Sequence, residues 1–418
     1  QIVAANSATL FYNYGDKLKF GRGAGATREP DTTWNQTGPT DIYKIEDTHI
    51  FGSSFFLTGM WSQVGGGFEL TPQGGDPGPA IRLSPDFIWQ QNYWHHTTDR
   101  PSEQYKLDGN YFFNTGTLSH ELKFGAGYRE ASVSATSSFS AHQYWAEPWG
   151  LLAMASDTYA ETYAEYTSAY LQDTMTFGNM TINAGLRYDE QTGGVEDAFT
   201  EGVPGFENIL PDQTVLGSPA DFTWEDISPR LGLTYALGED RSTLLRASYS
   251  RFAEQLRNGY SAINSSAGGY RYIYYYDFAD LNGDGTIQPE EVNNPQDYVT
   301  NGFEAGSGGT LNQTSRGFTA PITDEIILGV EHALMPELVI GANITFRTRS
   351  DLVTTDRLIN DGSSNDYGFG APGYRPEQQA DYNCSPTNVA LPGGGSNTIP
   401  VCGYRAQYGR RGRDRRKE

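Results

Sequence analysis

The sequence predicts an all-β protein that forms part of an antiparallel transmembrane β-barrel. Three observations support this fold class. Apolar and polar residues alternate with a period of two, short and long connections alternate strictly between the alternating segments, and aromatic residues gather toward the segment ends. Soluble antiparallel sheets also show the first pattern, so the prediction depends on all three together.

The alternation is clearest in NMTINAGLRYD, where Met180, Ile182 and Leu186 are apolar and the residues between them are polar or small. Successive side chains of a strand point to opposite faces, so this segment has one apolar face. The same pattern occurs in ELVIGANITFR (337–347), HELKFGAGYR (120–129), RLGLTYAL (230–237) and YKLDGNYFF (105–113). Less regular strand signals occur at 8–14, 17–21, 42–49 and 53–64.

Connection lengths favour a membrane barrel over a soluble sandwich. Outer-membrane barrels have short periplasmic turns and long extracellular loops, whereas a sandwich has no reason to place every long loop at one end. Short turns are expected at 114–119, 177–179, 238–241 and 335–337, and long polar loops at about 130–161, 191–222 and 257–317. Aromatic residues near strand ends, such as Tyr128 and Tyr188, fit an interfacial girdle. Ordinary sheet packing is the alternative for these aromatics, but it leaves the loop asymmetry unexplained.

Composition restricts the remaining classes. A net charge of -22 argues against a nucleic-acid partner, because phosphate binding needs a basic surface. No run of about 18 apolar residues is present, so no membrane-spanning helix is expected. The chain begins with Gln and lacks a signal segment, which predicts a processed or missing N-terminus. The basic stretch from Arg405 to Lys417 is interpreted as a disordered tail or an artefact of a truncated end.

Two cysteines, Cys384 and Cys402, bracket a stretch rich in Pro, Gly and Asn. In an oxidising compartment this spacing predicts a disulfide across a loop, and two unrelated thiols are the alternative.

Several ordered blocks carry a resemblance to a known family. They include YTSAYLQDTMTFGNMTINAGLRYD, ISPRLGLTYALGEDRSTLLRASYSRF, APITDEIILGVEHALMPELVIGANITFRTRSDLV and, upstream, GGGFELTPQGG, TDRPSEQYKLDGNYFF and SHELKFGAGYRE. Over most of 41–353 they resemble the barrel of TonB-dependent outer-membrane transporters, with the Oar-like group as the closest match. The resemblance implies a barrel of about 22 strands, with an N-terminal plug inside it and a segment that contacts TonB.

The chain departs from this family pattern in three places, because we recognise no plug, no TonB-contacting segment and no final amphipathic strand ending in an aromatic residue. The strand signals number about 11 or 12. Since a barrel leaves no unpaired edge in lipid, either these strands close by themselves or they belong to something larger. We expect residues 1–353 to form part of the barrel, and 354–418 to form a loop and a basic C-terminal tail.

One motif predicts a metal site. In DLNGDGTIQPEE, the residues at positions 1, 3, 5, 7, 9 and 12 of an EF-hand calcium loop are Asp280, Asn282, Asp284, Thr286, Gln288 and Glu291, with Gly285 at position 6. The aromatic segment before the loop does not resemble an entering helix. We therefore expect Ca²⁺ to bind weakly and to rigidify the extracellular loop 257–317 rather than to act as a switch. A polar Asp/Gly turn that resembles the motif by chance is the alternative.

A tyrosine cluster precedes this motif. Tyr272, Tyr274, Tyr275 and Tyr276 are candidate ligand-binding residues, because exposed aromatic faces stack on sugars or peptides. Packing of the loop against the barrel rim is the alternative.

No arrangement of residues predicts an enzyme. His95 and His96 are adjacent, so in a strand they point to opposite faces and do not chelate one ion together. GFGAPG at 368–373 matches a dinucleotide fingerprint but has neither the preceding strand nor the following helix that the fingerprint requires.

The sequence therefore predicts a receptor in the outer membrane of a Gram-negative bacterium. It would take up an unidentified small molecule, glycan, peptide or other scarce nutrient, and its partners would be membrane lipid and, through the plug, the TonB system. A passive porin or surface adhesin is the first alternative, and a secreted soluble carbohydrate-binding β-protein is the second.

Overall fold

The computed structural model describes residues 5–146, 151–263, 265, 272–275, 278–292, 299–301, 313–314, 317–363, 373–376, 382–390, 396–404 and 412–417. These residues lie mostly in strands, and the long strands pair antiparallel. The predicted all-β, antiparallel fold class is therefore confirmed. No helix among the described residues has the length and apolar character needed to cross a bilayer.

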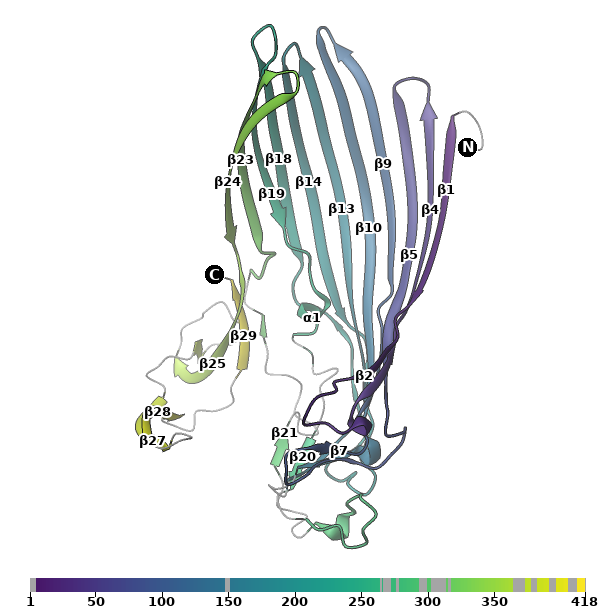
Figure 1. Ribbon diagram of the computed structural model, residues 1–418, viewed down its shortest axis with the longest axis vertical. Coiled ribbons are helices and arrows are strands. Elements are labelled where there is room, and N and C mark those ends of the chain that lie inside the picture. The colour runs from purple at the N-terminus through teal and green to yellow at the C-terminus, as the bar shows by residue number, and fades with distance from the viewer. Residues whose placement is uncertain are drawn as a thin grey trace.

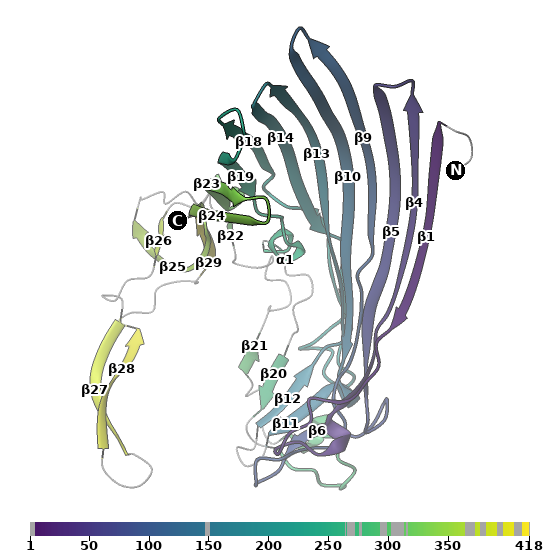
Figure 2. The same cartoon turned by 45° about the horizontal axis from the view of Figure 1, so that its top comes forward.

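Long strands form one tall, curved sheet, which we call the wall (Figure 1). Each strand pairs with its neighbours in chain order. The strands are β1 (Asn6–Asp16), β4 (Pro39–Phe51), β5 (Phe55–Pro72), β9 (Ser102–Thr115), β10 (Leu118–Ser138), β13 (Thr158–Phe177), β14 (Met180–Val195), β18 (Trp224–Leu237), β19 (Thr243–Ala253), β23 (Ile322–Met335) and β24 (Leu338–Ser350). Figure 2 shows the wall bending round from β1 to β24.

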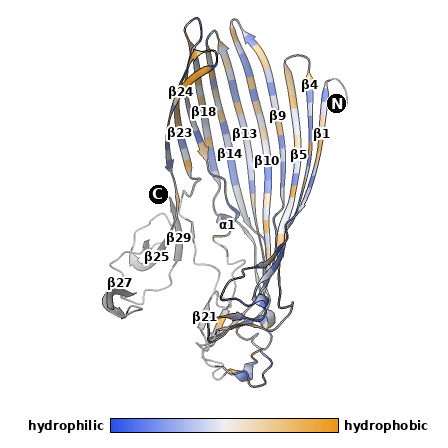
Figure 3. Ribbon diagram, viewed as in Figure 1, coloured by the Kyte–Doolittle hydropathy of each residue, from blue (hydrophilic) through white to orange (hydrophobic). Residues whose placement is uncertain are grey.

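The apolar positions of the alternating segments lie on the outside of this wall. Leu171 and Leu186 are register partners on β13 and β14, and their side chains are 54% and 58% exposed. In water such exposure would forgo about 25 cal/mol per Å² of apolar surface, whereas on a barrel these side chains face lipid. Figure 3 shows hydrophobic and hydrophilic residues alternating along the strands. The period-2 pattern therefore separates a lipid-facing surface from a polar inner surface.

All connections at one end of the wall are tight turns, and all those at the other end are long (Figure 1). In the turn between β13 and β14, Gly178 has a φ of 57° and open space around the position of a Cβ atom. Backbone conformation rather than crowding therefore favours glycine there. The predicted asymmetry of the connections is confirmed.

Two wall strands extend beyond the loop boundaries that the sequence suggested. A loop was expected at about 130–161, but the ladder between β10 and β13 continues from Glu130↔Glu165 to Ser137↔Thr158. Hydrophobic alternation stops where contact with lipid stops, while backbone hydrogen bonds continue without apolar side chains. These two strands therefore continue beyond the apolar band of the wall.

Four long loops fold together at the far end into a compact structure, which we call the cap. Three of them supply a six-stranded sheet with the order β21–β20–β12–β11–β6–β7. The fourth adds Val203, Phe206 and Leu210, which pack in one buried core with Leu152 and Ile273. The cap strands are β6 (Ile81–Leu83), β7 (Trp89–Gln90), β11 (Gln143–Ala146), β12 (Leu151–Ala155), β20 (Tyr272–Tyr275) and β21 (Val299–Asn301).

Short elements join the wall to the cap. Asn258, in the helix α1 (Asn258–Ser261), donates side-chain hydrogen bonds to the carbonyls of Ala131 and Thr162, which fixes the helix on β10 and β13. The short strands are β2 (Lys19–Arg22), β3 (Trp34–Thr37), β8 (His95–Asp99), β15 (Ala198–Thr200), β16 (Gln213–Val215) and β17 (Ser218–Pro219). The 3₁₀ turns are η1 (Pro30–Thr32), η2 (Ser140–His142) and η3 (Pro289–Glu291).

The described part of 354–418 also consists of strands, although the sequence led us to expect a loop and a tail. One sheet and a separate hairpin are formed. These strands are polar and lack the apolar alternation on which sequence-based recognition depends. The sheet contains β22 (Gln313–Thr314), β25 (Val353–Ser363), β26 (Gly373–Pro376) and β29 (Gly412–Lys417), and the hairpin contains β27 (Tyr382–Ala390) and β28 (Ser396–Tyr404).

Candidate functional site

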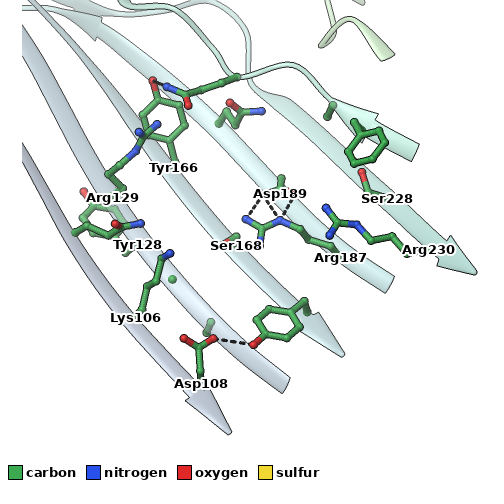
Figure 4. Close-up of a pocket in the computed structure, with 18 residues that line it drawn as sticks. Lys106, Asp108, Tyr128, Arg129, Tyr166, Ser168, Arg187, Asp189, Ser228 and Arg230 are labelled. Atoms are coloured by element: carbon green, nitrogen blue, oxygen red, sulfur yellow. Dashed lines mark hydrogen bonds and ion pairs between the residues drawn. The ribbon is translucent and has the colours of Figure 1, made fainter. Parts of the chain in front are cut away.

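The inner face of the wall carries a cavity of about 380 Å³ in the part of the wall next to the cap, and we call it the wall cavity. Strands β9, β10, β13, β14, β18 and β19 line it (Figure 4). The inward residues follow from strand alternation: Lys106 and Asp108 line the cavity, whereas Tyr105 and Leu107 are large exposed hydrophobic residues of the lipid-facing set. Polar side chains from separate strands are thereby gathered on one concave surface.

Four cationic side chains, Lys106, Arg129, Arg187 and Arg230, line the wall cavity together with two carboxylates, Asp108 and Asp189. The charged lining therefore carries a net charge of +2, although the whole chain carries -22. Each cation comes from a different strand. The sequence identified the inward-facing polar positions but not this cluster, because strand register determines which positions lie at the same height.

Among the residues that the structure describes, one of the four cations forms an ion pair with a carboxylate. Arg187 Nε donates to Asp189 Oδ1 at 3.0 Å and to Oδ2 at 2.9 Å, and Arg187 Nη2 donates to Oδ1 at 2.8 Å. The two residues are separated by two positions on β14 and therefore share its inner face. This carboxylate holds the Arg187 guanidinium in a fixed position at the cavity wall.

Aromatic rings hold two of the other cations. The guanidinium carbon of Arg129 lies 4.0 Å from the ring centroid of Tyr166, and that of Arg230 lies 5.4 Å from the ring centroid of Phe252. Tyr166 Oη in turn donates to the carbonyl of Leu256 at 2.6 Å, which ties its ring to the loop beneath the cap. A ring face orients a cation without neutralising its charge.

The second carboxylate is occupied by a hydroxyl group. Tyr170 Oη donates to Asp108 Oδ1 at 2.7 Å across the intervening strand β10. Gly125 is the register partner of both residues, and a Cβ atom added to Gly125 would lie 2.5 Å from Asp108 Oδ1 and 2.5 Å from Tyr170 Cε1. Glycine at this position makes the room for the hydrogen bond.

The predicted calcium loop is part of the cap. Ile287 and Val292 are buried in the cap core. Gln143 Nε2 donates to the Ile287 carbonyl at 2.6 Å, and the Ile287 N–H donates to Gln143 Oε1 at 2.9 Å. Both backbone groups of Ile287 are thus satisfied by one side chain from β11. The segment is therefore anchored in the cap and is not an isolated excursion.

The side chains of the predicted loop are turned toward its own backbone. Glu291 is 4% exposed, and its Oε1 and Oε2 atoms accept hydrogen bonds from the N–H groups of Leu281, Asn282 and Gln288. Asp280 accepts hydrogen bonds from the N–H groups of Gly283 and Gly285. In the described part of the chain, no three His, Cys, Asp or Glu side chains lie close enough together to hold a metal ion.

Further hydrogen bonds join the exposed side chains of this loop. Asn282 and Gln288 donate to Asp284 Oδ2 at 3.0 and 2.9 Å, and the Thr286 N–H donates to Asp284 Oδ1 at 2.8 Å. The Thr286 N–H and the two amides lower the pKa of the Asp284 carboxyl below its usual value. The carboxylate form is therefore favoured at neutral pH.

The tyrosine cluster is only partly described. Tyr275 is 1% exposed and belongs to the cap core, where its ring centroid lies 6.0 Å from that of Phe206. The Tyr275 ring thus packs within the cap, and the ligand-binding role of the tyrosine cluster stays a prediction. Tyr272 and Tyr274 lie in β20, which pairs with β12 and β21. Tyr276 lies outside the described residues.

The two adjacent histidines have separate surroundings. His95 Nε2 lies 2.9 Å from Glu69 Oε1 and His95 Nδ1 lies 2.7 Å from Asp76 Oδ2. His96 Nδ1 lies 2.6 Å from Ser137 Oγ. The two rings therefore have different partners, as the expected alternation requires.

The cysteine pair lies in the hairpin of β27 and β28, where Cys384 and Cys402 are register partners. Directly opposed residues in an antiparallel pair have Cα atoms about 4.5 to 5.5 Å apart, within the range of disulfides. The register is compatible with the predicted disulfide, which stays a prediction.

Comparison with known proteins agrees with this architecture. The family model described as "TonB dependent receptor-like, beta-barrel" matches residues 4–294. No curated protein sequence matches the chain. The matched family consists of receptors rather than enzymes.

Three solved outer-membrane proteins are similar to this chain at low sequence identity, and the first of them shares its fold. The outer membrane transporter YddB from Escherichia coli is 12% identical to this chain, with a TM-score of 0.54. The match covers 85% of this chain and 39% of the YddB chain. The ferric-catecholate import receptor Fiu from E. coli K12 is 12% identical with a TM-score of 0.46, covering 96% and 56%. The alcaligin outer membrane receptor FauA from Bordetella pertussis is 13% identical with a TM-score of 0.44, covering 84% and 51%. This chain thus spans about two fifths of the length of the first transporter.

Proposed function

Because the chain belongs to the β-barrel family of TonB-dependent receptors, we propose that it forms part of a receptor that takes up a scarce solute across the outer membrane. The family places the chain in the outer membrane of a Gram-negative bacterium, so the secreted soluble alternative no longer applies. The proposal includes a plug inside the complete barrel and gating by TonB. The sequence blocks quoted above lead us to propose further that the chain belongs to the Oar-like subgroup of this family.

One observation carries the proposal: four long loops at one end of the wall share a single buried core. The β6–β11 pairing and the β12–β20 pairing each join strands from different loops. Loops that only connected strands would have no need of a common hydrophobic core. A folded cap above a polar inner surface supports capture of a solute from outside.

The same surface supports a small solute with polar groups, in keeping with the proposed classes of glycan, peptide or other nutrient. Buried Ser228 and partly exposed Ser168 and Tyr170 line the wall cavity next to its charged groups. Ligand sites commonly combine a concave volume of about 300 to 1,000 Å³ with a few convergent polar side chains. The wall cavity meets both conditions.

The experiment that tests the proposal separates a gated receptor from a passive porin or an adhesin. The full-length protein is reconstituted into liposomes, and swelling is measured in isosmotic solutions of small sugars. A plugged receptor gives no swelling above empty liposomes, whereas a porin gives rapid swelling. In cells, nutrient-limited growth that requires both this protein and TonB supports the receptor, while growth that is independent of TonB contradicts it.

We further propose that the loop 280–291 binds Ca²⁺ within the cap. The complete twelve-residue pattern supports this proposal. Asp280, Asp284 and Glu291 place three carboxyl groups in one short loop, and no ion pair joins them to a cation among the described residues. Ca²⁺ binding requires these carboxylates to turn from backbone N–H groups toward the ion.

A disulfide between Cys384 and Cys402 is also proposed, supported by their register. Alkylation of the unfolded, unreduced protein followed by mass measurement tests it. Two blocked thiols would contradict the disulfide.

A further inference from the structure

We propose that the wall cavity binds an anionic group, such as a carboxylate, phosphate or sulfate carried by the transported solute. This inference rests on the proposed receptor function and adds the chemical class of the ligand. The cavity, its four cations and the way in which they are held support it.

Positive charge in the wall cavity exceeds the negative charge that could neutralise it. Asp189 neutralises Arg187, and Asp108 accepts the hydroxyl of Tyr170. In the described part of the chain, no carboxylate lies within ion-pair distance of Lys106, Arg129 or Arg230. A structural network would place a carboxylate beside each cation, so this excess favours an external anion as the missing partner.

Two of the arginines are held in position by rings before any anion binds. Tyr166 lies beneath the Arg129 guanidinium, and Phe252 lies beneath that of Arg230. Stacking on a ring leaves the N–H groups at the edge of a guanidinium available as donors. Planar donors presented in this way match the oxygen atoms of carboxylate and phosphate groups.

The cations come from both sides of the cavity. Figure 4 shows Lys106 and Arg129 on β9 and β10, with Arg187 and Arg230 on β14 and β18. Ser168, on β13 between these two pairs of strands, adds a hydroxyl group. An anion in the cavity would therefore meet donors from several strands, which favours a solute over a freely exchanging counterion.

The location argues against general electrostatic steering. With a net charge of -22, the chain as a whole repels anions, so the local charge of +2 acts only at short range. A volume of about 380 Å³ lies within the range of small-solute sites. Selectivity for an anionic small molecule follows from this contrast between local and overall charge.

The test measures binding by the full-length receptor in detergent, with the trisulfonated pyrene dye pyranine as the probe. Fluorescence anisotropy of pyranine is followed as the receptor is added, and inorganic phosphate, succinate or glucose is then used as a competitor. We expect saturable pyranine binding that phosphate and succinate reverse and glucose does not.

Two variants assign the binding to the wall cavity. In Arg129→Gln/Arg230→Gln the pyranine dissociation constant should rise by about tenfold or more, since charge-assisted hydrogen bonds are lost. The matched control is Arg246→Gln, which removes a cation that pairs with Glu331 and does not line this cavity. It should change the constant by about twofold or less, because exposed ion pairs contribute little.

The inference is overturned by no saturable binding to the wild-type receptor, by equal weakening in both variants, or by displacement by glucose. Another possibility is that the four cations hold an acidic segment of the same protein. The double variant would then keep pyranine binding and lose protease resistance, which also overturns the inference. None of these outcomes depends on TonB, so the receptor proposal stands or falls separately by its own uptake test.

Discussion

Tyr170 and Asp108 are joined by a 2.7 Å hydrogen bond although β10 lies between their strands. Gly125 makes this contact possible, because any side chain there would occupy the space between the two groups. The hydrogen bond fixes an inner-face tyrosine and a carboxylate at the edge of the wall cavity. A residue without a side chain thus helps to determine the shape of the proposed site.

Gly125→Ala should therefore destabilise the barrel and disturb the wall cavity. The added Cβ atom would lie 2.5 Å from both Asp108 Oδ1 and Tyr170 Cε1, so a side chain has to move. Overpacking of this kind costs about 1 to 3 kcal/mol. Denaturant unfolding of the full-length receptor in detergent measures the change.

Gly127→Ala is the matched control for this substitution. Its Cβ atom would meet Ser168 Oγ at 3.3 Å, which a small shift relieves. Equal unfolding midpoints for the two variants would show that the crossing contact does not constrain the wall.

Charges introduced on the two faces of the wall should have unequal effects. Ile182→Arg and Ile340→Arg place a cation in lipid, at a cost of about 2 to 4 kcal/mol near the membrane midplane. Asn183→Arg and Asn343→Arg place the same charge on the inner face, where it is solvated. Heat-modifiable mobility of the full-length protein in membranes measures assembly, and equal defects on the two faces would refute the assignment of faces.

The two ends of the wall should differ in access from outside the cell. A cysteine in place of Glu207, in the cap, should react with a membrane-impermeant maleimide on intact cells, whereas one in place of Asp240, in a tight turn, should not. Both positions are exposed, and each carboxylate accepts a local backbone N–H, from Gly205 to Glu207 and from Ser242 to Asp240. Labelling at position 240 but not at position 207 would mean that the tight turns, and not the cap, face the outside of the cell. A background variant with Cys384 and Cys402 replaced by serine keeps the readout specific.

Calcium should bind the cap through Glu291 and not through its neighbour Glu290. We expect a dissociation constant on the order of 10⁻⁴ to 10⁻³ M, as in extracellular calcium modules. Glu291→Gln removes the charge at position 12 and should abolish the heat of binding in calorimetry. Glu290→Gln, at an exposed site outside the ligand positions, should keep it.

Limited proteolysis gives an independent readout of the same prediction. Calcium should slow cleavage within 257–317 of the wild-type receptor and of Glu290→Gln, but not of Glu291→Gln. Absence of a heat of binding at millimolar calcium in the wild-type receptor, or identical cleavage of all three proteins, would contradict the calcium site.

The stability of the cap should depend on pH through His142 and Asp157. His142 Nδ1 lies 3.3 Å from Asp157 Oδ1, and this contact raises the pKa of His142 although burial opposes the shift. Because the pKa of His142 is higher in the folded state than in the unfolded state, this pair stabilises the cap fully at pH values below the unfolded pKa of about 6.5. The stabilisation is lost as the pH rises through the folded-state pKa.

Amide hydrogen exchange of the cap, corrected for the intrinsic effect of pH, checks this expectation. Protection should be greater at a pH of about 5.5 than at about 8 in the wild-type receptor, and the difference should shrink in Asp157→Asn. His332→Gln, at the turn end of the wall, serves as the control and should retain the difference. A pH dependence that persists in Asp157→Asn would exclude this pair as its source.

The fold class was determined by sequence alone because its signals are local. The alternation from Met180 to Tyr188 follows from the two-residue period of a strand, and the alternating loop lengths follow from a membrane with two unlike sides. The twelve-residue pattern from Asp280 to Glu291 is likewise visible in one short segment. None of these features requires knowledge of which distant residues meet.

Only the tertiary structure decided which side chains come together. Lys106 and Arg230 line one cavity because the register of several consecutive strands brings them to the same height, and alternation leaves that register open. Gln143 binds the backbone of Ile287 because two long loops meet in the cap. Tyr275 is buried for the same reason. Contacts between residues so far apart in the chain depend on how whole elements pack, and a periodic pattern within one segment carries no information about that packing.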